Sequence, residues 1–278
     1  MAQDVEDRIW QVADTIGPAT VAVSGGVDSV TLAVALHRRA PENTRVFHAV
    51  SPAVPPEATE RVRALAGTEG WTLRIADAGE FGDQNYLANP VNRCFFCKSN
   101  LYAAMRTLTD GTLLSGTNPD DLGDYRPGLE AAKANGVRHP FVEAGIGKAE
   151  VRMLARSLGL TDIAELPAQP CLSSRIETGI PVAAKTLGLV HRIEKAASDW
   201  LVERGKTPES VRCRVRRDGL VLELDPDSLS RIAASGDTDL LPRLAEIART
   251  GGQSEPPRLE AYRRGSAFLH GTDAGPAR

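Results

Sequence analysis

The chain has 278 residues, of which 42% are hydrophobic and 25% are charged, and its formal net charge is -3. This length favours two modest domains, and the charge provides no general basic field for holding a long nucleic acid. No apolar run approaches the roughly 20 residues that a membrane-spanning helix needs. Because the acidic start lacks the basic-then-apolar pattern of a signal peptide, we expect a cytoplasmic protein without a membrane partner.

Residues 1–170 alternate predicted strands with predicted helices. Short β-prone apolar runs predict strands at 20–23, 46–50, 71–75, 112–115 and 140–142. Helical patterns follow the glycines at 25 and 26 and recur at 56–67, 98–108, 127–134 and 148–158. This alternation is typical of an α/β fold with a doubly wound parallel sheet, which binds ligands beyond the carboxyl ends of its strands.

The pattern changes after a loop rich in Pro, Ser and Gly at about 166–181. A long helix is predicted at 183–204, followed by a β-hairpin that turns at Arg217-Asp218-Gly219, a helix at 227–249 and a strand near 259–263. We therefore expect residues 171–270 to form a smaller α+β domain on one antiparallel sheet. Residues 271–278 are expected to be a disordered tail.

A glycine-containing turn joins the first predicted strand to the helix after it, in the run Ser24-Gly25-Gly26-Val27-Asp28-Ser29. Gly25 and Gly26 let the backbone turn sharply and approach a ligand, and the helix start favours an anion. Ser24 and Ser29 add hydroxyl donors, and Asp28 could hold Mg²⁺ between phosphates. The structural alternative is an ordinary strand-to-helix turn with an aspartate N-cap.

This run is not a Walker A loop, because no Gly-Lys-Ser/Thr follows at the required spacing. It resembles the SGGxDS signature of the PP-loop ATP pyrophosphatases, whose fold is the adenine nucleotide alpha hydrolase-like one. The resemblance implies that the loop holds the β- and γ-phosphates of ATP. It also implies that an acceptor attacks the α-phosphate, becomes adenylated and releases pyrophosphate.

The four cysteines are too few for a disulfide scaffold in a chain of this size. Cys94 and Cys97 form a C-x-x-C, and Cys171 lies far along the chain. Three thiolates suit an iron–sulfur cluster with one open iron, whereas a structural zinc site would want a fourth ligand such as Cys213. The alternative is that these thiols are reduced and bind no metal.

Longer motifs resemble the LarE family, the sulfur transferases that help to build the nickel-pincer nucleotide cofactor of lactate racemase. The resemblance covers nearly the whole chain. Besides the glycine-containing run, it is carried by 92–98 (NRCFFCK), 116–128 (GTNPDDLGDYRPG), the helix at 148–159, 170–175 (PCLSSR), 214–216 (RVR) and 262–266 (YRRGS).

Membership would imply that ATP and Mg²⁺ serve to adenylate a carboxylate of pyridinium-3,5-biscarboxylic acid mononucleotide, which sulfur then converts to a thiocarboxylate. Family members with three cysteines are thought to carry the transferred sulfide on a 4Fe–4S cluster, here on Cys94, Cys97 and Cys171. Other members give up the sulfur of one cysteine, which matches Cys171. The resemblance also implies a homo-oligomer, with a hexamer as one candidate, and partners in the lactate racemase pathway.

Charged residues suggest contacts to this anionic substrate. Arg214 and Arg216, two apart on one strand face, could clamp its phosphate, or could line a solvated strand face. Glu194 resembles an acidic active-site residue of the family, as a base or Mg²⁺ ligand, and is otherwise a surface glutamate.

A second acidic group follows the predicted strand at 112–115. Asp120, Asp121, Asp124 and Arg126 are expected near the ligand, although Asn-Pro-Asp-Asp is also turn chemistry. Lys148 either neutralises phosphate charge or merely begins a helix.

Three other functions compete with the sulfur transferase. A tRNA thiolase would share the loop and the cysteines, but should show a basic face or an added RNA-binding module. A GMP or NAD synthetase would leave the three cysteines without a role. A non-enzymatic iron–sulfur or zinc module would leave the phosphate loop unexplained.

Overall fold

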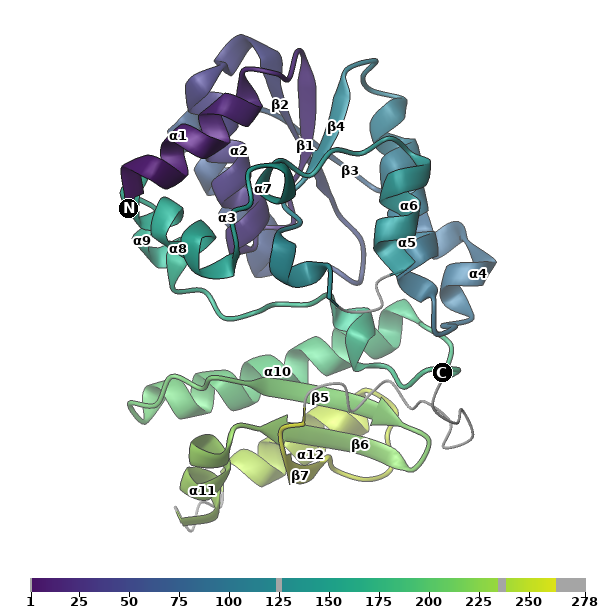
Figure 1. Ribbon diagram of the computed structural model, residues 1–278. Helices are drawn as coiled ribbons and strands as arrows, with labels where there is room; N and C mark the ends of the chain where they lie inside the picture. The colour runs from purple at the N-terminus through teal and green to yellow at the C-terminus, as the bar shows by residue number, and fades with distance from the viewer. Residues whose placement is uncertain (1, 124–126, 235–238, 264–278) are drawn as a thin grey trace, which may run out of the picture. The chain divides into compact units, whose positions relative to one another are not determined.

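The computed structural model describes residues 2–123, 127–234 and 239–263 (Figure 1). The chain divides into two compact units. The first unit comprises Met1–Tyr86 and Asn92–Gln169, and the second comprises Leu87–Val91 and Pro170–Arg278. No helix within the described ranges is both long and apolar enough to span a membrane.

The first unit contains a four-stranded parallel sheet in the order β3-β2-β1-β4. The strands are β1 (Ala19–Ala22), β2 (Thr44–Ala49), β3 (Thr72–Ala76) and β4 (Thr112–Ser115). Ala19 pairs with Thr44 on one side and with Thr112 on the other, so β1 is a central strand. The predicted α/β fold with a parallel sheet is therefore confirmed.

Helices cover both faces of this sheet (Figure 1). Val21 and Val46 belong to a core with α1, α2 and α8, whereas their neighbours Ala22 and Phe47 pack with α5 and α6. Because successive strand residues point to opposite faces, burial of both sets means that both faces are covered. The helices of this unit are α1 (Ala2–Ala13), α2 (Val27–Arg39), α3 (Pro56–Glu69), α4 (Gln84–Leu87), α5 (Arg93–Arg106), α6 (Pro127–Ala134), α7 (Pro140–Glu143), α8 (Lys148–Ser157) and α9 (Thr161–Ala164).

One predicted strand of this unit is wrong. Residues 140–142 begin α7, and Pro140 takes the first helical position, where proline is favoured because its fixed φ suits the helix and no N–H is needed. The extended segment lies just before it, where Arg138 forms an isolated parallel bridge with Leu114 of β4.

The second unit contains a three-stranded sheet in the order β5-β6-β7, with helices α10, α11 and α12. The expected hairpin is present, but β7 runs parallel to β6, so the prediction of a wholly antiparallel sheet is wrong. The elements are α10 (Ala184–Glu203), β5 (Val211–Arg216), β6 (Gly219–Leu224), α11 (Pro226–Ala234), α12 (Leu240–Thr250) and β7 (Arg258–Ala261). A long crossover that includes helices returns the chain in the parallel sense.

The single helix predicted at 227–249 is also wrong, because Asp239 is the N-cap of a separate helix, α12, which begins at Leu240. Pro242 lies in the first turn of α12, where its missing N–H costs no helical hydrogen bond. The tail predicted to be disordered lies outside the described residues.

A short segment of the first half belongs to the second unit. Asn89 Nδ2 donates to the carbonyl oxygens of Glu177 and Ile180 at 2.9 and 2.8 Å, and the Gly179 N–H donates to Asn89 O at 2.9 Å. Asn89 is fully buried with φ 54°, a left-handed conformation that asparagine tolerates better than most residues. These long-range bonds explain why Leu87–Val91 groups with the later part of the chain.

Candidate active site

The order of the strands predicts where the first unit binds a ligand. The connection after β1 leads to β2 on one side, whereas β4 lies on the other side of β1. Chain connections therefore diverge between β1 and β4, and such switch points form the ligand crevice of open α/β sheets. The glycine-containing run follows β1, and a short 3₁₀ helix, η3 (Pro119–Asp121), follows β4.

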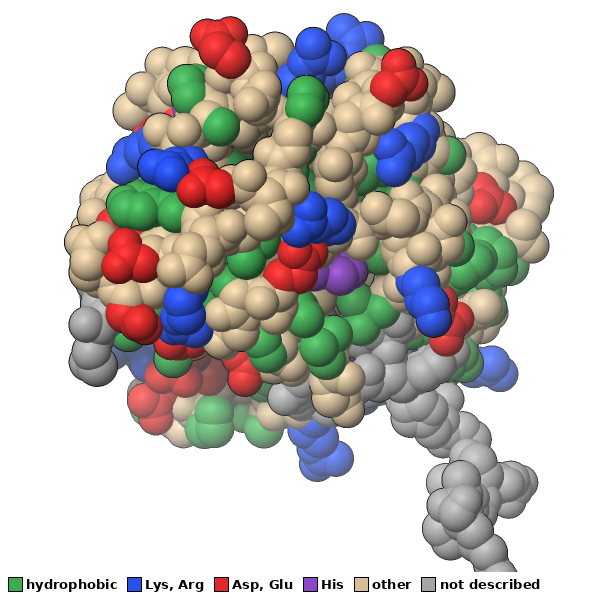
Figure 2. All heavy atoms as spheres, turned by 45° about the horizontal axis from the view of Figure 1, so that its top comes forward, with side chains coloured by type: hydrophobic (Ala, Val, Ile, Leu, Met, Phe, Trp, Pro, Cys, Tyr) green, Lys and Arg blue, Asp and Glu red, His purple; other side chains and the backbone are tan. Residues whose placement is uncertain are grey.

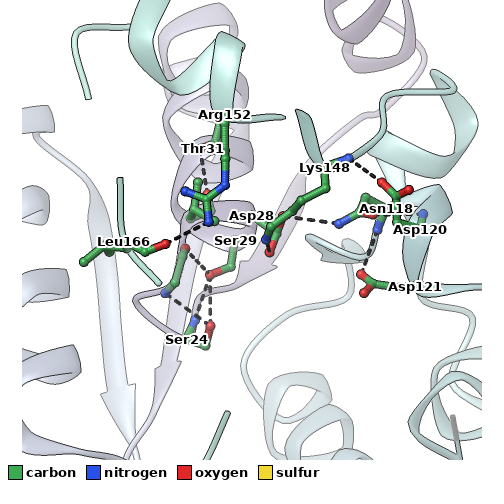
Figure 3. Close-up of polar contacts among 12 residues, drawn as sticks. Ser24, Asp28, Ser29, Thr31, Asn118, Asp120, Asp121, Lys148, Arg152 and Leu166 are labelled. Carbon is green, nitrogen blue, oxygen red and sulfur yellow. Dashed lines mark hydrogen bonds and ion pairs between the residues drawn. The ribbon is translucent and has the colours of Figure 1, made fainter. Parts of the chain in front are cut away.

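Hydrogen bonds within the glycine-containing run, here called the phosphate loop (24–29), fix its shape. Ser29 Oγ accepts from the Ser24 N–H at 3.1 Å and donates to Gly26 O at 3.2 Å. The two serine hydroxyls lie 3.2 Å apart (Figure 3). Gly25 has φ +85°, which glycine adopts without strain. The N-cap of α2 is Gly26 and no side chain caps the helix, so the interpretation as an aspartate N-cap is wrong.

The Asp28 carboxylate connects three segments of the first unit. Lys148 Nζ, at the start of α8, donates to Oδ2, and Asn118 Nδ2 donates to Oδ1 at 3.2 Å. Asp120 accepts from the Lys148 backbone N–H at 2.5 Å, so the turn after β4 meets the start of the helix that carries the lysine (Figure 3). Asp28, Asp120 and Lys148, which were predicted separately, therefore form one network.

The turn after β4 is held by a capping box. Asn118 Oδ1 accepts from the Asp120 N–H at 3.0 Å, and the Asn118 N–H donates to Asp121 Oδ2 at 3.2 Å. Asp121 thus stabilises the turn, whereas Asn118, to which the sequence assigned no role, reaches Asp28. The turn chemistry of Asn-Pro-Asp-Asp was a signal for the capping box, but no local pattern signalled the contact of Asn118 with Asp28. The predicted site residues Asp124 and Arg126 lie outside the described residues.

Gly116→Ala is expected to destabilise the first unit and separate the two halves of the site. A Cβ at this position would lie 2.7 Å from the backbone nitrogen of Ser29 and 2.8 Å from the carbonyl carbon of Asp28. Because backbone atoms must move to relieve this overlap, we expect a loss of about 1–3 kcal/mol in the free energy of unfolding. Urea denaturation measures it, with Gly123→Ala as the control, since nothing lies within 4 Å of a Cβ there. Equal stability of the two variants would contradict the prediction.

A second polar network lies in the second unit, around Arg175 at the end of a 3₁₀ helix (Leu172–Arg175). Arg175 donates from Nε and Nη2 to the two oxygens of Glu194 at 2.9 and 3.0 Å. Glu194 also accepts from the Cys213 N–H at 2.8 Å. Both oxygens of Glu194 are therefore engaged, and its role as a base or Mg²⁺ ligand stays a prediction.

Arg175 also holds the backbone that carries Cys171. Its Nη1 donates to Pro170 O at 2.6 Å and to Cys171 O at 3.1 Å. The Arg175 side chain is only 4% exposed, so its position is well defined by packing and by these bonds. The Cys171 side chain itself is exposed. The sequence assigned no role to Arg175, which lies in the motif that carries Cys171.

The arginines of β5 share one face of their strand, as predicted from their spacing of two. Arg214 and Arg216 donate to the two oxygens of Glu223 at 2.9 and 2.8 Å, and Arg216 donates to Glu260 at 3.1 Å. Burial lowers the pKa of Arg212, and the neighbouring Arg175 lowers it further, as expected where cations crowd together. The role of Arg214 and Arg216 as a phosphate clamp stays a prediction.

The cysteines are divided between the two units. Cys94 and Cys97 lie three residues apart near the start of α5, whereas Cys171 and Cys213 belong to the second unit. Cys213 is fully buried, and burial raises the pKa of its thiol, so that it stays protonated. Among the residues that the structure describes, no three His, Cys, Asp or Glu side chains are grouped to hold a metal. The cysteines suit a cluster by ligand type, and a cluster on Cys94, Cys97 and Cys171 stays a prediction.

On the face shown in Figure 2, basic and acidic side chains are intermixed.

Comparison with known proteins places the chain among relatives of similar length. No family model matches it. It is 35% identical over 235 residues to an uncharacterized protein of Synechocystis sp., covering 83% of this chain and 85% of that protein. It is 29% identical over 181 residues to the pyridinium-3,5-bisthiocarboxylic acid mononucleotide synthase of Lactiplantibacillus plantarum, covering 63% and 65%. An uncharacterized protein of Methanocaldococcus jannaschii is 24% identical over 216 residues, covering 76% and 79%. This chain therefore belongs to one family with the Synechocystis protein, and it is more distantly similar to the mononucleotide synthase.

Proposed function

We propose that this protein is an ATP-dependent sulfur transferase that adenylates a carboxylate of pyridinium-3,5-biscarboxylic acid mononucleotide and converts it to a thiocarboxylate. The observation that carries the proposal is the phosphate loop at the switch point of the sheet, with Asp28 held by Lys148 and Asn118. The name of the Lactiplantibacillus relative, a bisthiocarboxylic acid mononucleotide synthase, supports the choice of substrate.

The phosphate loop is suited to the polyphosphate of ATP. A Cβ at Gly25 would lie 2.9 Å from Ala58 O, so the loop backbone packs closely where only glycine fits. Gly26 at the N-cap leaves the start of α2 without a side-chain cap, and the positive end of a helix favours an anion. Asp28 provides a carboxylate for Mg²⁺, and Lys148 beside it provides a positive charge for phosphate oxygens.

In the proposed chemistry, adenylation makes AMP the leaving group in place of a carboxylate oxygen. In the first step a substrate carboxylate oxygen attacks the α-phosphorus of ATP, and the bond to pyrophosphate breaks. In the second step a sulfur nucleophile attacks the activated carbonyl carbon, and the bond to AMP breaks. Acyl adenylates hydrolyse, so both steps require a site that excludes water.

The sulfur is proposed to be delivered at the cysteines of the chain, and two mechanisms differ in whether it is a sulfide on a cluster or the sulfur of Cys171 itself. In the first, an iron–sulfur cluster held by Cys94, Cys97 and Cys171 would carry the transferred sulfide. In the second, the Cys171 thiolate forms a thioester with the substrate, and loss of the Cys171 Cα proton breaks its Cβ–S bond. The thiocarboxylate then leaves, and dehydroalanine remains in the chain.

The test is an assay of protein purified without oxygen, with Mg²⁺, ATP and the biscarboxylic acid mononucleotide. We expect one AMP and one pyrophosphate for each oxygen replaced by sulfur, with the product identified by mass spectrometry. Pyrophosphate release that responds to bulk tRNA, but not to the mononucleotide, would favour a tRNA thiolase and contradict the proposal.

A further inference from the structure

Helix α3 packs directly against the phosphate loop. The Ala58 carbonyl oxygen lies where a side chain at Gly25 would begin, and Arg61, one turn further along, donates from Nη1 to Gly25 O at 2.8 Å. The same nitrogen lies 3.4 Å from Gln169 Oε1. Arg61 is half-buried, so it is placed by the fold rather than extended into solvent.

The hydrogen bonds of Arg61 end on neutral groups, and Glu57 interacts with its charge. Within the described residues, the acceptors of its hydrogen bonds are a carbonyl and an amide oxygen, both neutral. Burial lowers the pKa of Arg61, and Glu57 opposes this effect through its charge. A half-buried guanidinium with neutral acceptors costs desolvation free energy, which a nearby anionic ligand would offset.

The bond from Arg61 fixes the direction of a backbone N–H. No described peptide bond is cis, so the Gly25 carbonyl and the Gly26 N–H point in opposite directions across their shared peptide plane. Arg61 holds the carbonyl toward α3. The N–H therefore points to the other side, where it lies 3.4 Å from Ser24 Oγ, beside the Ser29 hydroxyl.

The alternative orientation of this peptide would oppose anion binding. Two consecutive glycines offer little steric resistance to rotation of the plane between them. After such a rotation the Gly25 carbonyl oxygen would face the phosphate, where its partial negative charge repels the ligand. A charge-assisted hydrogen bond from Arg61 stabilises the orientation with the N–H inward, and thereby raises the fraction of protein ready to bind.

We propose that Arg61 is a positioning residue of the phosphate loop, which holds the Gly25–Gly26 peptide so that the Gly26 N–H meets the polyphosphate of ATP. The inference rests on the proposed function. Because Arg61 acts on the ligand through this peptide, its loss should weaken the binding of ligands that carry the β- and γ-phosphates. It should not weaken the binding of the nucleoside part.

The test compares Arg61→Gln with the wild type by titration calorimetry, using Mg²⁺ with ATP, pyrophosphate or AMP. We expect Arg61→Gln to weaken ATP and pyrophosphate binding by about 10- to 100-fold, the range for losing a hydrogen bond to a charged group. AMP affinity should stay within about twofold, because AMP lacks these phosphates. Arg61→Lys, which keeps a charged donor, should recover most of the loss.

Arg63→Gln is the matched control, because Arg63 is on the same helix, is exposed, and forms a loose ion pair with Glu60 at 3.7 Å. Thermal unfolding without nucleotide checks that each variant is folded, and Arg61→Met, which keeps the apolar stem but has no donor, supplies the result if Arg61→Gln is not. Equal ATP affinity of wild type and Arg61→Gln, or an equal loss for ATP and AMP, would overturn the inference alone. Failure of the wild type to bind ATP and pyrophosphate would overturn the proposed function as well.

Discussion

Cys171→Ser is expected to abolish thiocarboxylate formation while leaving substrate-dependent release of pyrophosphate within about threefold of the wild type, because adenylation needs no sulfur. The exposed Cys171 thiol is attached to a backbone that Arg175 holds through two carbonyl oxygens. A serine preserves this backbone but provides neither a transferable sulfur nor a soft thiolate ligand. Product mass and pyrophosphate, measured in the same reaction, check the prediction.

The control for this variant is Cys213→Ala, because Cys213 is fully buried and its thiol stays protonated. It should retain sulfur transfer in proportion to its folded fraction. Full thiocarboxylate formation by Cys171→Ser would contradict the assignment of Cys171 to sulfur delivery.

The two mechanisms of delivery leave different chemical traces in the wild type. A cluster predicts bound iron and acid-labile sulfide that fall when Cys94 or Cys171 is replaced. Direct donation predicts single turnover and a protein mass lower by one H₂S.

Asp28→Asn is expected to lower AMP formation at saturating ATP by about 100-fold or more, the scale of removing one preorganised electrostatic contact to a reacting phosphoryl group. The asparagine fits the same space and can still accept from Asn118, but it cannot provide a charged ligand for Mg²⁺ or pair with Lys148. We expect the loss to fall on the first step, which consumes ATP, whereas the thermal stability should change little.

Initial rates of AMP release across a Mg²⁺ titration measure this effect. The matched control is Asp110→Asn, an exposed aspartate in the turn that precedes β4. A wild-type rate for Asp28→Asn at saturating Mg²⁺ would show that the carboxylate takes no part in catalysis, and would remove Asp28 from the site.

Much of the local structure was predictable, because it depends on residues close together in sequence. The strand at 112–115 and the helix at 127–134 were predicted with the bounds of β4 and α6. The hairpin was predicted from alternating residues around Asp218-Gly219. Two predictions failed near prolines. A strand was predicted at 140–142, but Pro140 begins helix α7. One long helix was predicted at 227–249, but Pro242 lies in the first turn of a separate helix, α12.

The sequence by itself determined the alternation of strands and helices, the phosphate loop between the first strand and its helix, and the face that Arg214 and Arg216 share. Only the tertiary structure decided which distant residues meet. Asn118 and Lys148 reach Asp28 from 90 and 120 residues away, because β4 lies beside β1 in the sheet. It also decided that Arg61 holds the Gly25 carbonyl and that β7 runs parallel to β6. Strand order and helix packing are set by burial summed over each whole unit, which no short stretch of sequence records.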